Sequence, residues 1–276
     1  MKTRHAYCER CLVASVAAAV FVSTAVPATP AELQARTVAA FDHYVQVVEI
    51  RMSAGGPFLW VDGLPEPEQG ARRNEVRRGA LLIERVTTRE GGKDITIPDG
   101  LVHHWIGLAF VPGITIDAAL ALLQDYDRHA EIYRPVVARS KLLARNGDMF
   151  RVYLRFSMKK VITVVVNSEH DAYFSRDGPD RAHSRIYSTR IAEVEAPDTP
   201  SEREKPVGRD GGYLWRLYTY WRFLERDGGV YVQCESITLT RGIPAGFGWL
   251  IRPFVTEIPR ESLEFTLTTT RKTLAP

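Results

Sequence analysis

Cysteine is scarce in this sequence, and the positions of the few cysteines exclude a disulfide framework. The 276 residues include only three cysteines, and two of them, Cys8 and Cys11, lie near the N-terminus. Their C-x-x-C spacing adjoins a stretch that resembles an export signal, so we expect both to be removed with it. Cys234 then has no partner for an intramolecular disulfide. It lies in a predicted strand, where a buried and inert thiol is expected.

Recognised catalytic motifs are absent as well. The sequence has no G-x-S-x-G, no H-E-x-x-H and no glycine-rich phosphate loop. His103 and His104 are adjacent, and adjacent strand residues face opposite ways, so they do not readily bind one metal ion. The same geometry disfavours the consecutive residues Glu169, His170 and Asp171 as ligands of one metal ion. We predict no metal, no cofactor and no catalytic residue, although a triad assembled from distant residues stays open.

Charge of one sign is not concentrated anywhere. The chain has 36 basic and 33 acidic residues, a net charge of +3, and its basic pairs, such as Arg72-Arg73, are isolated. Nucleic-acid binding needs a concentrated basic face, so no nucleic-acid partner is predicted. With 45% hydrophobic residues the composition is that of an ordinary globular protein.

The longest apolar run lies at the N-terminus. Lys2 and Arg4 precede an apolar stretch at 11–22, and small residues allow cleavage after Ala25. The run is shorter than the roughly 20 residues of a transmembrane helix. Residues 1–25 therefore predict a removed signal peptide and an exported protein, periplasmic or secreted. An uncleaved membrane anchor is the alternative.

Residues 31–100 are expected to extend the main domain. The apolar residues of 31–52 recur at helical spacing and form one stripe. This stripe must be buried on the domain or on a membrane surface. Its polar side carries both acids and bases, which favours packing on the domain. The segment as a whole is too short for a solid core of its own.

Residues 101–274 predict one α+β domain. A strand at 101–111 is followed by two short helices between Ile116 and Tyr133. Alternating apolar patterns then predict six strands, at 136–145, 149–158, 161–174, 182–194, 213–225 and 229–240. Residues 196–210 are expected to form an exposed loop, and 246–273 a closing helix. A long helix across a curved sheet of about seven antiparallel strands buries its inner face and can leave a cavity.

Several local motifs agree with this order of elements. They are GLVHHWIG at 100–107, LLQDYD at 122–127, STRIAEV at 188–194, YWRF at 220–223 and IPRESLEF at 258–265. With them the chain resembles the START-like superfamily, the SRPBCC or polyketide cyclase–lipid transport group, and within it a group of exported bacterial proteins. The resemblance implies a helix-grip fold and a hydrophobic ligand such as a sterol, phospholipid, quinone, polyketide or plant hormone. Some members are cyclases or hydroxylase subunits, and no shared catalytic motif carries over.

Polar residues on the predicted strands are candidates for ligand contact. Glu235 and Arg241 share a strand face with two apolar residues, and Arg190 shares one with Ser188. A buried charge needs a partner, so Glu235 is expected to pair with an arginine. Such a pair either anchors a ligand head group in the cavity or is a structural support. The predicted ligand-binding residues are Tyr153, Arg155, His170, Arg190, Trp221, Glu235 and Trp249.

The aromatic residues of 213–223 fall into two sets. Trp215, Trp221 and Phe223 are expected on one strand face, and Tyr218 and Tyr220 on the other. One set can line the cavity, and the other can cover the outer sheet or meet the N-terminal helix. The apolar cluster that precedes the closing helix can gate the cavity or touch a membrane transiently. It comprises Phe247, Trp249, Leu250 and Phe254.

These patterns support three functional hypotheses. The leading one is an exported, non-catalytic carrier that holds a hydrophobic or amphipathic small molecule between the sheet and the C-terminal helix. The second is a cyclase- or aromatase-like enzyme, with His170, Glu235 and Tyr153 as acid or base. The third is an interaction protein that docks on an envelope partner through residues 31–100.

Overall fold

The structure is a computed structural model, and it describes residues 31–160, 162–242 and 257–275. One antiparallel sheet of nine strands dominates it, in the order β2-β5-β13-β12-β9-β8-β7-β6, with β10 paired to β9. The strands are β2 (Leu82–Arg85), β5 (Gly100–Pro112), β6 (Val137–Asn146), β7 (Met149–Lys159), β8 (Thr163–Arg176), β9 (Arg181–Glu195), β10 (Arg203–Glu204), β12 (Arg216–Arg226) and β13 (Gly229–Arg241). The first long strand, β5, therefore lies beside the last, β13.

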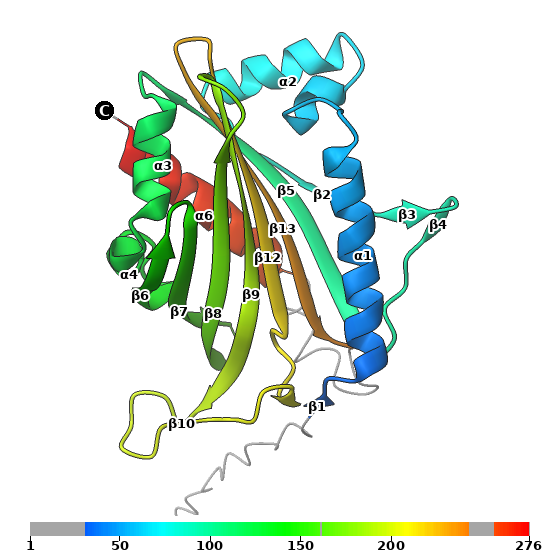
Figure 1. Cartoon of the computed structure of the whole chain (residues 1–276), viewed down its shortest axis with the longest axis vertical. Coiled ribbons are helices and arrows are strands. Elements are labelled where there is room, and N and C mark those ends of the chain that lie inside the picture. The colour runs from blue at the N-terminus through cyan, green and yellow to red at the C-terminus, as the bar shows by residue number, and fades with distance from the viewer. Residues whose placement is uncertain (1–30, 161, 243–256, 276) are drawn as a thin grey trace, which may run out of the picture.

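Helices cover both faces of this sheet (Figure 1). The C-terminal helix α6 (Ile258–Leu274) crosses one face, and the N-terminal helix α1 (Ala35–Ser53) runs along the other. The remaining helices of the described residues are η1 (Trp60–Gly63), α2 (Glu68–Arg77), α3 (Ile116–Gln124), η2 (Tyr126–Arg128) and α4 (His129–Ile132). Two small ribbons pair β1 (Ala31–Glu32) with β11 (Arg209–Asp210), and β3 (Arg89–Glu90) with β4 (Lys93–Asp94).

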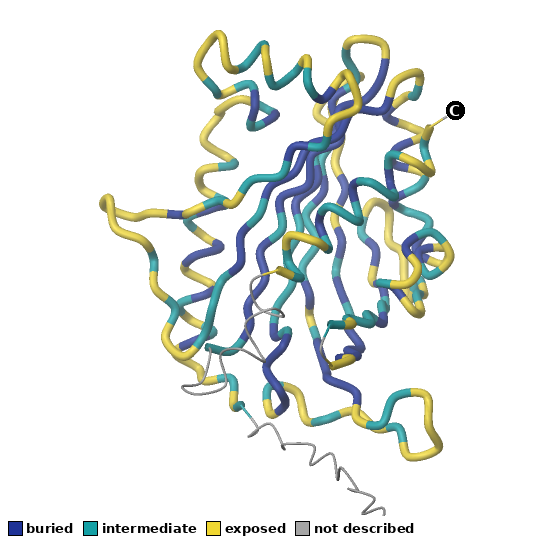
Figure 2. Tube along the Cα trace, turned by 180° about the vertical axis from the view of Figure 1, so that it is seen from behind, coloured by how far each residue is buried: buried dark blue, intermediate teal, exposed yellow. Residues whose placement is uncertain are grey.

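Each face of the sheet has its own apolar core. On the α6 face, Leu263 and Leu267 pack with Trp221, Phe223 and residues of α3. On the α1 face, Phe41 and Val48 pack with Ile237 and other strand residues. The central strands are consequently buried along most of their length, as Figure 2 shows from behind. The apolar stripe of α1 is thus buried on the domain, as its mixed polar side indicated.

The predicted helix-grip architecture is confirmed, with two differences in extent. The sheet has nine strands and not about seven, because β2 pairs with the edge of β5 and β10 pairs with β9. The second of these pairings lies within 196–210, which the sequence presented as an exposed loop. The closing helix begins at Ile258, with Pro259 in its first turn. The part of the predicted helix at 246–256 lies outside the described residues.

The sheet and α6 approach one another closely at Gly107 on β5. A Cβ atom on Gly107 would lie 2.5 Å from Cδ1 of Leu267 and 3.3 Å from the carbonyl oxygen of Leu82. We therefore expect Gly107→Val to lower the free energy of unfolding by about 1–3 kcal/mol through overpacking. Urea unfolding measures the loss. Gly56→Val is the matched control, since its Cβ would meet no atom within 4 Å, and an equal effect of both changes would contradict this account.

Candidate functional site: a cavity between the sheet and the C-terminal helix

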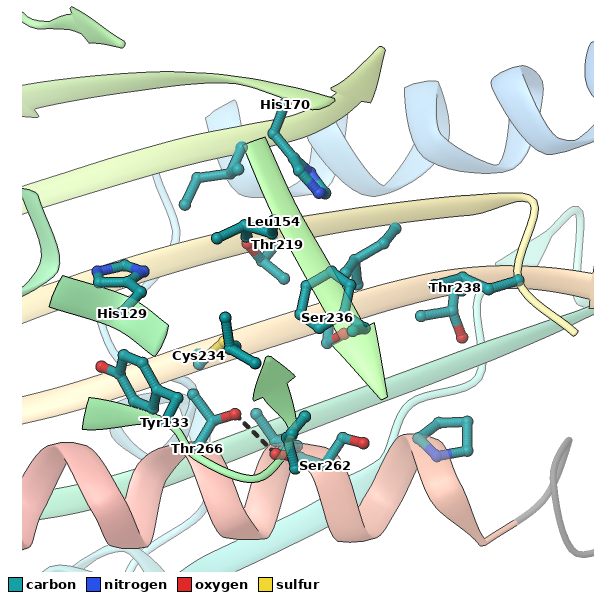
Figure 3. Close-up of a pocket in the computed structure, with 18 of the residues that line it drawn as sticks. His129, Tyr133, Leu154, His170, Thr219, Cys234, Ser236, Thr238, Ser262 and Thr266 are labelled. Atoms are coloured by element: carbon teal, nitrogen blue, oxygen red, sulfur yellow. Dashed lines mark hydrogen bonds between the residues drawn. The ribbon is translucent and has the colours of Figure 1, made fainter. Parts of the chain in front are cut away.

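A cavity of about 200 Å³ lies between the inner face of the sheet and α6 (Figure 3). Alternation along the strands supplies its walls, because every second residue of a strand points to the same face. β12 contributes Leu217, Thr219 and Trp221, and β13 contributes alternate residues from Cys234 to Thr240. Apolar side chains of α6, α3, β7 and β8 complete the enclosure.

The described lining carries no Asp, Glu, Lys or Arg. Its polar groups are hydroxyls, one thiol, two imidazoles and one indole. They belong to Tyr126, His129, Tyr133, His170, Tyr213, Thr219, Trp221, Cys234, Ser236, Thr238, Thr240, Ser262 and Thr266. A chamber with apolar walls and a few uncharged polar groups suits a hydrophobic molecule with hydrogen-bonding substituents.

His170 is the predicted site residue that brings an imidazole into the cavity. It lies on β8, and its Nε2 is 2.9 Å from Oγ of Ser168. Burial lowers the pKa of His170 to about 4, so the ring is neutral at pH 7. Its Nδ1 is buried and has no hydrogen-bond partner among the described residues. Trp221 also lines the cavity. Contact of either residue with a ligand stays a prediction.

A cluster of three aromatic rings, which we call the tyrosine–histidine cluster, closes one end of the cavity. The rings of Tyr126 and His129 lie 4.7 Å apart, and those of His129 and Tyr133 lie 5.1 Å apart. The hydroxyl of Tyr133 is 2.9 Å from Oγ1 of Thr270 on α6. Figure 3 shows His129 and Tyr133 together beside α6. The spacing of these residues, i, i+3 and i+7 in a predicted helical segment, is the signal that the sequence interpretation did not use.

Tyr153 and Arg155 do not line the cavity, which corrects their predicted placement. Both lie on β7, and the alternate residues Val152 and Leu154 take the inward positions. Arg155 is 2% exposed because a loop after β9 folds over it, and its guanidinium donates to both oxygens of Glu202 at 2.8 and 2.9 Å. These contacts raise the pKa of Arg155 and lower that of Glu202 to about 2. Arg155 therefore fixes a loop on the outer face.

Arg190 is also outside the cavity, and a β-bulge is the reason. The register of β8 and β9 shifts so that His170 opposes Ser188 while Glu169 opposes Arg190. Paired residues of neighbouring strands point the same way, so Ser188 faces inward and Arg190 outward. The expectation that they share a face is therefore wrong. Arg190 instead forms an ion pair with Glu204 of β10.

Glu235 lies on the α1 face of the sheet, within a buried polar network. Nε2 of His104 is 2.7 Å from its carboxylate, and the hydroxyl of Tyr44 is 2.9 Å from Nδ1 of the same histidine. Arg51 of α1 also donates to the carboxylate. Burial alone would raise the pKa of Glu235, but His104 and Arg51 outweigh it and hold that pKa below its ordinary value. Glu235 thus has its arginine partner, but the pair is structural.

The two sets of aromatic residues are placed largely as predicted. Trp221 and Phe223 belong to the core on the α6 face, whereas Tyr218 and Tyr220 belong to the α1 side. Trp215 is the exception, since it packs with the α1-side core and donates from Nε1 to Asp210 at 3.1 Å. It precedes the first residue of β12, so strand alternation does not govern its direction. The predicted site residue Trp249 and its apolar neighbours lie outside the described residues.

His103 and His104 point to opposite faces of β5, as alternation predicted. His103 Nε2 is 3.1 Å from Oγ1 of Thr240, while His104 contacts Glu235 on the other side. Across residues 31–160, 162–242 and 257–275, no group of three or more His, Cys, Asp or Glu side chains is arranged to hold a metal ion. Among the helices in these ranges, none combines the length and hydropathy that crossing a bilayer requires.

The arrangement of sheet and helix decides the fold class. A twisted antiparallel sheet places its first and last long strands side by side, and the final helix of the chain crosses its inner face over a cavity. The fold is START-like. No protein-family model matches the chain, and no curated protein matches it.

Solved START-like structures show the same likeness at low sequence identity. The STAR-related lipid transfer protein of Xanthomonas axonopodis is 15% identical, with 69% of this chain and 98% of that chain covered and a TM-score of 0.45. The Zhui aromatase/cyclase of Streptomyces sp. R1128 is 13% identical, with 63% of this chain and 94% of that chain covered and a TM-score of 0.43. Human STARD10 is 12% identical, with 76% of this chain and 81% of that chain covered and a TM-score of 0.41. At such scores these likenesses do not decide what this chain binds.

Proposed function

We propose that this START-like protein is an exported carrier that binds a hydrophobic or amphipathic small molecule in the cavity beneath α6. The observation that supports it is the cavity of about 200 Å³, whose described walls are mostly apolar and carry no formal charge. Removing the ligand's apolar surface from water would supply the affinity, at about 25 cal/mol per Å². Release of the ligand would require movement of α6 or of the chain that leads into it.

The chemistry of the cavity favours binding over a cyclase- or aromatase-like reaction. Of the three residues suggested as acid or base, His170 lines the cavity, while Glu235 and Tyr153 lie on the other face of the sheet. A pKa of about 4 makes His170 a weak base at neutral pH, and general acid–base catalysis works best when the pKa is near the operating pH. Burial also raises the pKa of the Cys234 thiol, which keeps it protonated and a poor nucleophile.

Packing of α1 also favours a carrier over an envelope interaction protein. The apolar stripe of α1 is covered by the outer face of the sheet, with Phe41 and Val48 fully buried. That stripe is therefore not free to dock on a partner. Export itself is proposed from residues 1–25, whose sequence resembles a cleavable signal. Fractionation of the cells of origin and mass determination of the N-terminus test this part, and an intact cytoplasmic chain would reject it.

Mass spectrometry of the protein purified from its native envelope tests the carrier function. Native conditions measure the stoichiometry of a bound molecule, and solvent extraction identifies it. We expect a lipid, quinone or polyketide at near one equivalent. A chain that is reproducibly empty, and that also fails to take up any apolar probe in solution, would contradict the proposal.

Filling the cavity provides a second test. Thr219 lines the cavity on β12, and phenylalanine suits a strand while adding a ring to the chamber. We expect Thr219→Phe to lower ligand occupancy at least tenfold, because the apolar body of the ligand loses its space, while the protein stays folded. Thr189→Phe, at an exposed position of β9, is the matched control and should bind normally. Equal occupancy of both variants would place the ligand elsewhere.

A further inference from the structure

We propose that Tyr126 and His129 form a polar subsite that binds a hydroxyl group of an uncharged, otherwise apolar ligand. This inference rests on the proposed carrier function, and it specifies the ligand class. Both residues line the cavity at its η2–α4 end, with their rings 4.7 Å apart. Tyr126 is 3% exposed and His129 is 7% exposed, so each is more than nine-tenths buried.

Two polar atoms of this subsite have no hydrogen-bond partner among the described residues. The hydroxyl of Tyr126 and Nε2 of His129 are buried, and no described residue hydrogen bonds to either. Buried polar groups are nearly always hydrogen-bonded, because losing water without a replacement is costly. Tyr133, in the same cluster, follows this rule through Thr270 on α6. Both exceptions belong to residues that line the cavity and whose rings are in contact, which points to a partner supplied by the ligand.

The chemistry of these two atoms selects a hydroxyl group. Burial lowers the pKa of His129 to about 4, so its ring is neutral and has one donor and one acceptor nitrogen. The backbone of Leu122 and Leu123 accepts from the ring, which leaves Nε2 as the acceptor. The phenol of Tyr126 can donate, and burial raises its pKa, so it keeps its proton. A ligand hydroxyl can donate to His129 and accept from Tyr126 at the same time.

Other head groups fit this subsite less well. A ketone can accept from Tyr126 but cannot donate to Nε2 of His129. A carboxylate or phosphate would meet the lone pair of Nε2, and the described lining offers no cation to offset its burial. A hydrocarbon would leave both atoms unpaired. The site therefore discriminates by leaving polar groups unsatisfied when the ligand lacks the matching group.

Three probes of equal chain length test this preference in the purified protein. 1-Aminoanthracene, an uncharged apolar fluorophore, reports occupancy of the cavity, and 1-dodecanol, dodecane and dodecanoate compete with it. We expect the alcohol to bind about tenfold more tightly than the alkane, the gain of about one good hydrogen bond, and dodecanoate to bind most weakly. In Tyr126→Phe the alcohol should fall to the affinity of the alkane, and His129→Phe should act in the same direction.

Thermal unfolding of the empty protein separates a binding role from a structural one. Tyr126→Phe removes an unpaired hydroxyl, so the midpoint of unfolding should stay the same or rise. Tyr133→Phe is the matched control in the same cluster: it breaks the bond to Thr270, so it should lower the midpoint and leave the preference for the alcohol intact. The two variants should shift the unfolding midpoint in different ways, and this difference distinguishes a binding subsite from ordinary packing.

The possible failures are distinguishable. If the probes bind but the alcohol and the alkane compete equally, or if Tyr126→Phe keeps the preference, the subsite is wrong and the carrier function stands. If dodecanoate binds best, the ligand is anionic and the inference of an uncharged head group is overturned. If neither 1-aminoanthracene nor any of the three competitors binds, the proposed carrier function fails, and the subsite fails with it.

Discussion

Lowering the pH from 7 to 4 is expected to remove most of the free energy of unfolding. Burial lowers the pKa of His103, His129 and His170 to about 4, whereas a histidine of an unfolded chain titrates near 6.5. Between these values the unfolded state binds more protons than the folded state. Stability is therefore fully present above pH 6.5 and falls as the pH drops toward 4.

The expected loss is large relative to the stability of a domain. Each of the three histidines contributes about 3 kcal/mol, and together they reach about 10 kcal/mol. Domains are typically stable by about 5–15 kcal/mol, so acid should unfold the protein before pH 4. Urea unfolding at a series of pH values between 4.5 and 7.5 measures this. A free energy of unfolding that stays constant over that range would contradict the burial of neutral imidazoles.

Neighbouring charges change the size of the pKa shift at single histidines, but they do not change its direction. Burial is the main cause at all three histidines, and Arg85 adds to it at His103. Asp125 and Asp171 act in the opposite direction at His129 and His170, more weakly than burial. The double variant His129→Phe, His170→Phe is the control. It should lose about two thirds of the pH dependence, since phenylalanine fills the same space without a titrating group.

The strands and their turns could be predicted closely from the sequence. Alternating apolar residues located the six consecutive strands to within a few residues, because two-residue periodicity and turn chemistry act locally. Asp227 and Gly228 form the turn between β12 and β13, with φ of 59° and 75°. Both values lie in the left-handed region, which explains why aspartate and glycine occupy these two positions.

Which face of each strand looks into the cavity could not be predicted in the same way. Alternation groups Glu235 with Ile237 and Leu239, and the structure keeps them together. It does not say whether α6 or α1 covers that group. Because helices pack on both faces, residues on both faces are largely apolar, and hydrophobicity no longer marks the inner one. Three of the predicted ligand-binding residues, Tyr153, Arg155 and Glu235, accordingly lie on the outer face.

Two further errors in the predicted site, the direction of Arg190 and the missed tyrosine–histidine cluster, have local causes that sequence periodicity does not detect. The bulge between β8 and β9 inserts one residue, so Arg190 turns away from the face of Ser188. The tyrosine–histidine cluster was missed because its i, i+3 and i+7 spacing was not used: it runs through two helical segments of only three and four residues. The role proposed for Tyr126 and His129 follows from their unpaired atoms together with the place of both residues in the cavity lining.

Removing the carboxylate of Glu235 is expected to be the most damaging single change on the α1 face. Glu235→Ala leaves the Nε2–H of His104 without its acceptor at 2.7 Å, and it leaves Arg51 without its ion-pair partner. Leaving the buried N–H of His104 unsatisfied typically costs about 1–3 kcal/mol, whereas Arg51, whose side chain is 51% exposed, stays in contact with water. Glu235→Gln keeps an oxygen acceptor for His104 and should cost less. Urea unfolding at pH 7 measures both losses.

The control is an ion pair of similar chemistry at the surface. Glu195 pairs with Arg203, with side chains 47% and 74% exposed. Exposed pairs contribute about 0–1 kcal/mol, so Glu195→Ala should have little effect on unfolding. A loss in Glu235→Ala no larger than that in Glu195→Ala would show that the network beneath α1 does not stabilise the fold.

Ligand affinity distinguishes this structural role from the head-group anchor that the sequence suggested. Glu235 points away from the cavity, while its neighbours Cys234 and Ser236 line it. Folded Glu235→Ala protein should therefore bind 1-aminoanthracene as tightly as the unchanged protein, when both are measured at pH 7 without denaturant. The cavity side of the sheet keeps its side chains in this variant, and only the attachment of α1 weakens. A tenfold loss of affinity with unchanged stability would instead return Glu235 to the ligand site.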